Sequence, residues 1–174
     1  MTLQEFFQQH PEAAVAFSGG VDSAWLLHQA VRYARRCTAY FVNTAFQPGF
    51  ELEDAEQTAR QVGAELRVLE LDILSAPEVT ANPSDRCYHC KKRLFTALAR
   101  AAAEDGYHVL LDGTNASDDA GDRPGMRALR ELAVESPLRL CGMTKAHVRA
   151  ASKEAGLFTW DKPAYACLAT RVPT

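Results

Sequence analysis

The residue types best suited to chemistry lie in a short stretch between two apolar segments: Ser18, Gly19, Gly20, Val21, Asp22 and Ser23. The apolar run 13–17 precedes this stretch, and residues 24–34 follow it with apolar side chains at helical spacing. This order predicts a strand, a tight loop and a helix. The first N–H groups of a helix have no partner within it and lie at the positive end of its dipole, so the loop is expected to bind an anion, most naturally a phosphate.

The individual side chains of this stretch fit that prediction. Gly19 and Gly20 allow the backbone to come close to a ligand, and the hydroxyls of Ser18 and Ser23 add donors. Asp22 stands where a magnesium ion bridging phosphates would take a carboxylate oxygen. The stretch has no lysine of the GxxxxGK[ST] type, so it is not a Walker A loop.

Two of the five cysteines form a second candidate site, because two residues separate Cys87 from Cys90. Residues 93–104 predict a helix, so the pair should stand at a helix start, where the dipole and neighbouring cationic side chains favour thiolate. In a chain of this composition the spacing favours metal binding or thiol chemistry over structural disulfides. Cys37 and Cys141 have apolar neighbours and are expected to be buried.

The overall composition limits the class of protein. The 174 residues are 47% hydrophobic, which is enough for one domain with a core. A net charge of −3 offers no basic surface for a polyanion, so a small nucleotide is a better partner than nucleic acid. No apolar run approaches the roughly 20 residues of a membrane span, and the first residues are not basic as in a signal peptide. We therefore expect a cytoplasmic protein without membrane contact.

Strands and helices alternate along the sequence, which predicts an α/β fold with an open, parallel, five-stranded sheet and helices on both faces, of the Rossmann-like kind. The expected strands are 13–17, 38–43, 66–71, 107–111 and 136–140. The expected helices are 2–10, 24–34, 51–62, 93–104, 126–133 and 145–155, the last of them capped by Thr144. Ligands of such sheets bind beyond the carboxyl ends of the strands, so the stretch 18–23, Asn43 and the polar cluster 112–119 should face one crevice.

The stretch 18–23 resembles the SGGxDS loop of the ATP pyrophosphatase, or PP-loop, superfamily, whose members adenylate a substrate and release diphosphate. Further blocks resemble one family of that superfamily, the ATP-dependent sacrificial sulfur transferases of the LarE type. These blocks are 85–91, 112–119, 122–128, 136–138 with Lys145 and Arg149, and 160–171. The resemblance implies an adenine nucleotide alpha hydrolase-like fold and the use of ATP with Mg2+.

Enzymes of this family act in the biosynthesis of the nickel-pincer nucleotide. The resemblance therefore implies that a carboxylate of a pyridinium mononucleotide is adenylated and that sulfur is then inserted. Cys167 matches the reactive cysteine of the family and is the candidate sulfur donor. A variant of the family instead holds an iron–sulfur cluster on three cysteines and passes on a sulfide bound to that cluster. Cys87, Cys90 and Cys167 supply such a trio, and three thiolates leave one iron of a [4Fe-4S] cluster open.

Polar and cationic residues in the matched blocks complete the predicted site. Lys91 and Arg171 are the expected phosphate or carboxylate contacts, and with Asp22 and Cys167 they are the predicted catalytic residues. Further nucleotide-binding residues are expected at Asn43, Thr114, Asn115, Arg123 and Lys145. Two adjacent acids, Asp118 and Asp119, are candidate ligands for a metal ion or for the substrate ribose.

Alternatives stay open at two levels. Zinc could bind the three thiolates with His89 as a fourth ligand, or Cys87 and Cys90 could form a redox pair. The chain could also serve another PP-loop chemistry, either amide formation as in NAD and GMP synthetases or thiolation of tRNA. Finally, it could be an ATP- or AMP-binding module without catalysis.

The extent of the chain bears on that last alternative. In the family, the chain continues beyond the reactive-cysteine segment into a smaller C-terminal domain, whereas this sequence ends at Thr174, three residues after Arg171. We therefore expect residues 1–174 to form one PP-loop domain without the C-terminal domain of the family. Nucleotide binding should survive that loss, whereas complete turnover and assembly into a homo-oligomer are left open.

Overall fold

A parallel sheet lies at the centre of the computed structural model, which describes residues 1–44, 49–71, 86–117 and 123–162. The order of its strands is β3-β2-β1-β4, and every pairing is parallel. The strands are β1 (Glu12–Ala16), β2 (Arg36–Asn43), β3 (Glu65–Glu70) and β4 (Leu110–Leu111). The strand that leads into the stretch 18–23, β1, therefore has a neighbour on each side.

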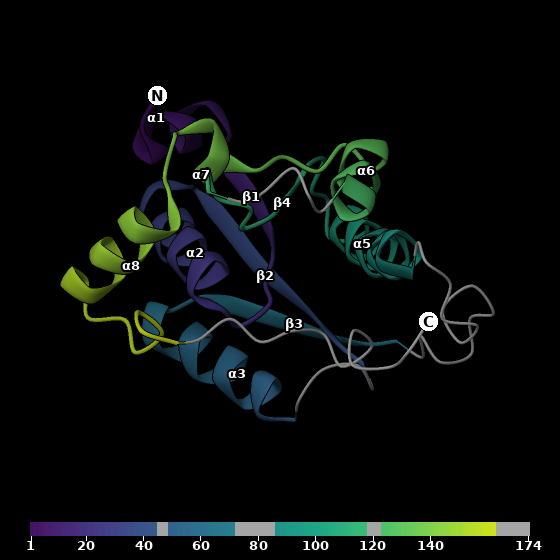
Figure 1. Ribbon diagram of the computed structural model, residues 1–174, viewed down its shortest axis with the longest axis horizontal. Coiled ribbons are helices and arrows are strands. Elements are labelled where there is room, and N and C mark those ends of the chain that lie inside the picture. The colour runs from purple at the N-terminus through teal and green to yellow at the C-terminus, as the bar shows by residue number, and fades with distance from the viewer. Residues whose placement is uncertain (45–48, 72–85, 118–122, 163–174) are drawn as a thin grey trace.

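Helices cover both faces of this sheet (Figure 1). They are α1 (Leu3–Gln9), α2 (Val21–Tyr33), α3 (Phe50–Val62), α5 (Arg86–Glu104), α6 (Arg123–Glu131), α7 (Pro137–Leu140) and α8 (Lys145–Glu154). Successive side chains of a strand point to opposite faces, which divides the buried residues into two apolar clusters. Val15 and Phe41 pack with α1, α2, α3, α7 and α8, whereas Ala14 and Tyr40 pack with α5 on the other face.

The predicted α/β class, a parallel sheet with helices on both faces, is confirmed. Local signals also placed several helix ends correctly. Gly63, expected to end the helix 51–62, is the C-cap residue of α3 with a φ of +77°, a value that favours glycine. Within the described ranges, no helix is long and apolar enough to cross a membrane.

The expected fifth strand, 136–140, is wrong. Residues Pro137–Leu140 form the short helix α7, and the described part of the sheet has four strands. Proline lacks the N–H that a strand needs, and its fixed φ suits the first turn of a helix, where Pro137 stands. Pairing stops one step earlier, at an isolated parallel bridge between Glu135 and Leu111.

Two further boundaries differ from the expectation. The helix expected at 93–104 begins at Arg86, so Cys87 and Cys90 lie within the first turns of α5 instead of preceding the helix. The strand expected at 107–111 is reduced to Leu110–Leu111. Tyr107 is instead turned toward β2, where its hydroxyl is 2.8 Å from that of Thr38.

The cap of α8 gives a testable prediction about stability. The Thr144 hydroxyl accepts a hydrogen bond from the N–H of His147 (3.2 Å), and the His147 ring accepts one from the N–H of Thr144 (3.2 Å). Replacement Thr144→Ala should lower the free energy of unfolding by about 1 kcal/mol, because it leaves a helix N–H without its acceptor. Urea denaturation measures the change, and Thr144→Ser, which keeps the hydroxyl, should unfold as the wild type does. Equal stability of the alanine variant would contradict the role of the cap.

Candidate functional site

The stretch 18–23 forms a closed loop between β1 and the first turn of α2. The hydroxyl oxygens of Ser18 and Ser23 lie 3.0 Å apart, and the Ser18 N–H donates to the Ser23 oxygen at 3.2 Å. Gly19 has a φ of +81°, in the left-handed region that favours glycine. Gly20 is the N-cap residue of α2 and has no side chain to cap it. The predicted strand, tight loop and helix are thus present, and the start of α2 is suited to an anion.

The loop after β4 lies directly against the first turn of α2. A Cβ atom added to Gly113 would lie 2.9 Å from the backbone nitrogen of Ser23, closer than real Cβ atoms come. This approach brings the buried side chain of Asn115 to Asp22, so that the Asn115 amide donates to Asp22 Oδ2 at 3.1 Å. The predicted meeting of the two segments at the carboxyl ends of neighbouring strands is therefore observed, and it requires a residue without a side chain at 113.

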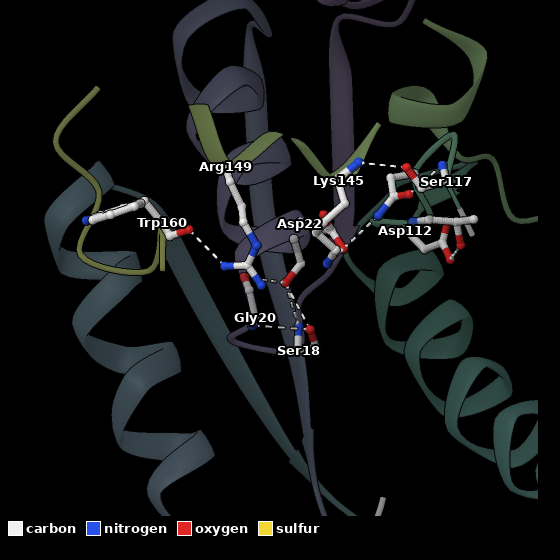
Figure 2. Close-up of polar contacts among 11 residues, drawn as sticks. Ser18, Gly20, Asp22, Asp112, Ser117, Lys145, Arg149 and Trp160 are labelled. Atoms are coloured by element: carbon white, nitrogen blue, oxygen red, sulfur yellow. Dashed lines mark hydrogen bonds and ion pairs between the residues drawn. The ribbon is translucent and has the colours of Figure 1, made fainter. Parts of the chain in front are cut away.

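Asp22 accepts a second, charged partner from α8. Lys145 Nζ lies 2.5 Å from Asp22 Oδ2, and the Asp22 side chain is 18% exposed (Figure 2). The other carboxylate oxygen, Oδ1, is buried and has no hydrogen-bond partner among the described residues. Buried polar atoms in proteins usually have partners, so this oxygen is the natural place for a bound cation or a ligand donor. Asp22, Asn115 and Lys145 form one unit, as expected for members of one site.

Asp112 holds the turn that carries Asn115. One of its carboxylate oxygens accepts from the Ser136 hydroxyl at 2.5 Å, and the other accepts from the Thr114 hydroxyl at 2.6 Å. The Asp112 side chain is buried, so these bonds replace water as its partners. Thr114 was predicted to bind a nucleotide, but in the structure its hydroxyl is used to fix the turn.

The other predicted residues are distributed as follows. Asn43 lies at the carboxyl end of β2, where its amide donates to both oxygens of Glu70 at 3.2 and 3.3 Å. Lys91 lies early in α5, the helix on the face of the sheet opposite α2. Arg123 is the first residue of α6. The structure does not describe the side chains of Arg123, Cys87 and Cys90, and Asp118, Asp119, Cys167 and Arg171 lie outside the described residues.

Sequence reasoning missed Lys162. Its ammonium group lies 2.9 Å from the carbonyl oxygen of Gly19, 2.9 Å from Asp54 Oδ2 and 3.2 Å from Glu51 Oε2. The carboxylates come from α3, and the lysine lies in the segment after α8. The only signal in the sequence was its place in the block 160–171, because spacing alone does not reveal which lysine folds inward.

A second cation of α8 supports the same segment. Arg149 donates to the carbonyl oxygen of Trp160 at 2.9 Å, and Figure 2 shows its side chain leaving α8 toward Trp160. Gln61 of α3 holds the segment from the other side, donating to the carbonyl oxygen of Gly156 at 2.8 Å. The segment from Gly156 to Lys162 is therefore fixed to both α8 and α3.

Cys37 and Cys141, which were expected to be buried, are only half-buried, but their thiols are still unsuited to chemistry. Burial raises the pKa of the Cys37 thiol to about 12, and the charge of Glu65 adds to the effect. Burial also raises the pKa of Cys141. A thiol with a raised pKa is a poor nucleophile and a poor metal ligand at neutral pH. Among the side chains that the structure describes, no group of three or more His, Cys, Asp or Glu residues gathers to hold a metal ion.

Comparisons with solved structures show which known proteins share the fold. No family model matches the chain. NMN synthetase from Francisella tularensis has the same fold, with a TM-score of 0.69 and 14% identity over 93% of this chain and 70% of that one. So does the tRNA thiolase NcsA from Methanococcus maripaludis, solved with its [4Fe-4S] cluster, with a TM-score of 0.69 and 18% identity over 97% and 68% of the chains. These neighbours share the fold of the chain, and the loop 18–23 carries the SGGxDS pattern of the PP-loop superfamily that it resembles.

The chain is also similar in sequence to curated proteins. The chain is 33% identical to the pyridinium-3,5-bisthiocarboxylic acid mononucleotide synthase of Lactiplantibacillus plantarum over 99% of its own length and 63% of that protein. It is 38% identical to an uncharacterised protein of Synechocystis over 98% of its own length and 64% of that protein. The resemblance to the LarE type that the motifs indicated is thereby confirmed. The chain spans somewhat less than two thirds of the length of these relatives.

The approach of Gly113 to α2 gives a second prediction. Gly113→Ala should lower the free energy of unfolding by about 1–3 kcal/mol, because the new methyl group must push apart two backbones that now touch. Urea denaturation measures the loss, and the amide NMR signals of Asp22 and Ser23 should move. The matched control is Gly49→Ala, where an added Cβ meets nothing within 4 Å. Equal effects of the two substitutions would show that the contact has no energetic weight.

Proposed function

We propose that this chain is the ATP-binding domain of a sulfur transferase of the LarE type. It adenylates a carboxylate of a pyridinium mononucleotide, releases diphosphate, and delivers sulfur from a cysteine or from a cysteine-bound cluster to the activated carboxylate. The observation that carries the proposal is the unit of Asp22, Asn115 and Lys145 at the start of α2, in a chain similar over almost its whole length to a synthase of such a mononucleotide.

The start of α2 is the part that binds the phosphates of ATP. Backbone N–H groups and the positive end of the helix dipole attract an anion there. Lys145 neutralises Asp22, so a phosphate does not meet an uncompensated carboxylate. Donors fixed in place before the reaction stabilise the negative charge that develops on the departing diphosphate.

Asp22 is the residue suited to hold a magnesium ion. Its Oδ1 is buried without a partner among the described residues, and Mg2+ in nucleotide sites takes one or two carboxylates together with phosphate oxygens. When bound, the ion neutralises charge on the phosphates and orients the leaving group. Lys145 and Asn115 hold the carboxylate through Oδ2, which leaves Oδ1 as the oxygen for the ion.

We assign the sulfur chemistry to Cys87, Cys90 and Cys167. Cys87 and Cys90 lie in the first turns of α5, where a helix dipole favours thiolate. With Cys167 they make a trio that fits a [4Fe-4S] cluster with one open iron. The tRNA thiolase NcsA, which has the same fold, is solved with its [4Fe-4S] cluster. Zinc on the trio with His89, and Cys167 as a single-use donor, are the competing assignments.

The metal role of Asp22 can be tested by Asp22→Asn. We expect release of diphosphate from ATP, with a pyridine-carboxylate mononucleotide as acceptor, to fall about 100-fold or more, because the carboxylate that holds the metal is gone. A coupled diphosphate assay measures it. The exposed carboxylate of Glu56 on α3 provides the control, and Glu56→Gln should retain the wild-type rate. An active Asp22→Asn variant would remove Asp22 from this role, and a wild type that binds ATP but never releases diphosphate would favour a binding module.

The cluster assignment is tested by anaerobic reconstitution with iron and sulfide. The wild type should develop the brown absorbance of an iron–sulfur cluster, and Cys90→Ala should abolish it by removing one of three ligands. Cys37→Ala should reconstitute normally, because Cys37 is half-buried on β2 and the pKa of its thiol is raised. Metal analysis that finds only zinc bound to the wild type would contradict the cluster.

A further inference from the structure

Lys162 occupies a site built to hold one ammonium group. The side chain is 9% exposed, and burial of a charge is costly unless the charge is paired and hydrogen-bonded. A lysine ammonium has three N–H donors, and three acceptors surround this one: Glu51, Asp54 and the carbonyl oxygen of Gly19. Its bonding capacity is therefore filled by the protein itself, so Lys162 has no donor left for a phosphate.

The bond to Gly19 acts on the backbone of the loop. The peptide group between Gly19 and Gly20 is planar and trans, so its carbonyl oxygen and its N–H point in opposite directions. By holding the Gly19 oxygen on the side of α3, Lys162 fixes the direction of the Gly20 N–H, which donates to the Ser18 hydroxyl oxygen at 3.3 Å within the loop. Glycine at 19 can rotate more freely than other residues, so the bond from Lys162 restricts a peptide that its own sequence leaves flexible.

Helix α3 packs against the loop beside Lys162. A Cβ atom added to Gly19 would lie 3.2 Å from the carbonyl oxygen of Glu51, so the loop rests on the first turn of α3. Glu51 and Asp54 lie on that turn with side chains that are 12% and 27% exposed. Lys162 thus joins three segments that are far apart in sequence: the loop, α3 and the segment after α8.

We propose that Lys162 is a positioning residue that orients the Gly19–Gly20 peptide for the phosphates of ATP. The proposal rests on the proposed function in one respect, that the loop binds ATP. It assigns no contact between Lys162 and the nucleotide. Loss of the ammonium group should therefore lower the affinity of the domain for ligands that carry phosphates and leave its affinity for adenosine unchanged.

The test must separate this role from the cost of leaving two carboxylates without their cation. Lys162→Met alone should lower both the melting temperature and the affinity for ATP. The triple variant Lys162→Met, Glu51→Gln, Asp54→Asn removes the unpaired charges while the Gly19 oxygen stays without its anchor. We expect this variant to melt within a few degrees of the wild type, yet to bind ATP about tenfold more weakly, since hydrogen bonds to charged groups are among the stronger ones.

Calorimetric titration with ATP and NMR titration with adenosine give the two affinities. Arg100→Met, which removes an exposed cation of α5 on the opposite face of the sheet, is the control and should bind ATP as the wild type does. Wild-type ATP affinity in the triple variant would overturn the positioning role alone. An equal loss of adenosine affinity would overturn it as well, because the defect would then be general. Failure of the wild type to bind ATP would overturn the proposed function and this proposal together.

Discussion

The contact between the backbone of Gly113 and the first turn of α2 is the constraint on which the site depends. Parallel strands β1 and β4 end at the same edge of the sheet, so the segments that follow them must share the space there. The two backbones lie so close that a Cβ atom added to Gly113 would be 2.9 Å from the backbone nitrogen of Ser23. This closeness allows the short side chain of Asn115 to donate a hydrogen bond to Asp22.

Charge around the loop is balanced by two lysines that act on different groups. Lys145 pairs with the side chain of Asp22, and Lys162 pairs with the backbone of Gly19 and with carboxylates of α3. The first pair is partly exposed, with 34% of the Lys145 side chain and 18% of the Asp22 side chain accessible. The second is more deeply buried and is saturated by the protein. In the function we propose, the first pair contacts the ligand and the second holds the loop.

Features encoded by neighbouring residues were predictable. The loop 18–23, the cap at Thr144 and the helix end at Gly63 each depend on backbone preferences within a few positions, and all three are present in the structure. The approach of the segment after β4 to Asp22 was also predictable, because parallel topology places strand ends together. The strand expected at 136–140 failed for a local reason that was visible in the sequence, since Pro137 suits the start of a helix better than a paired strand.

Features that depend on tertiary packing were not predictable in this way. Nothing near Lys162 in the sequence indicates that its ammonium group would be buried, because the acceptors come from two other segments. One of these acceptors, the carbonyl oxygen of Gly19, lies 143 positions earlier in the sequence. The same holds for Gly113, whose need to lack a side chain arises only when β4 lies beside β1. A lysine is ordinarily exposed, and the energetic reason to bury one exists only when all of its partners are in place. The burial of Lys162 therefore depends on the tertiary fold that brings Gly19, Glu51 and Asp54 together, and not on the residues next to it in the sequence.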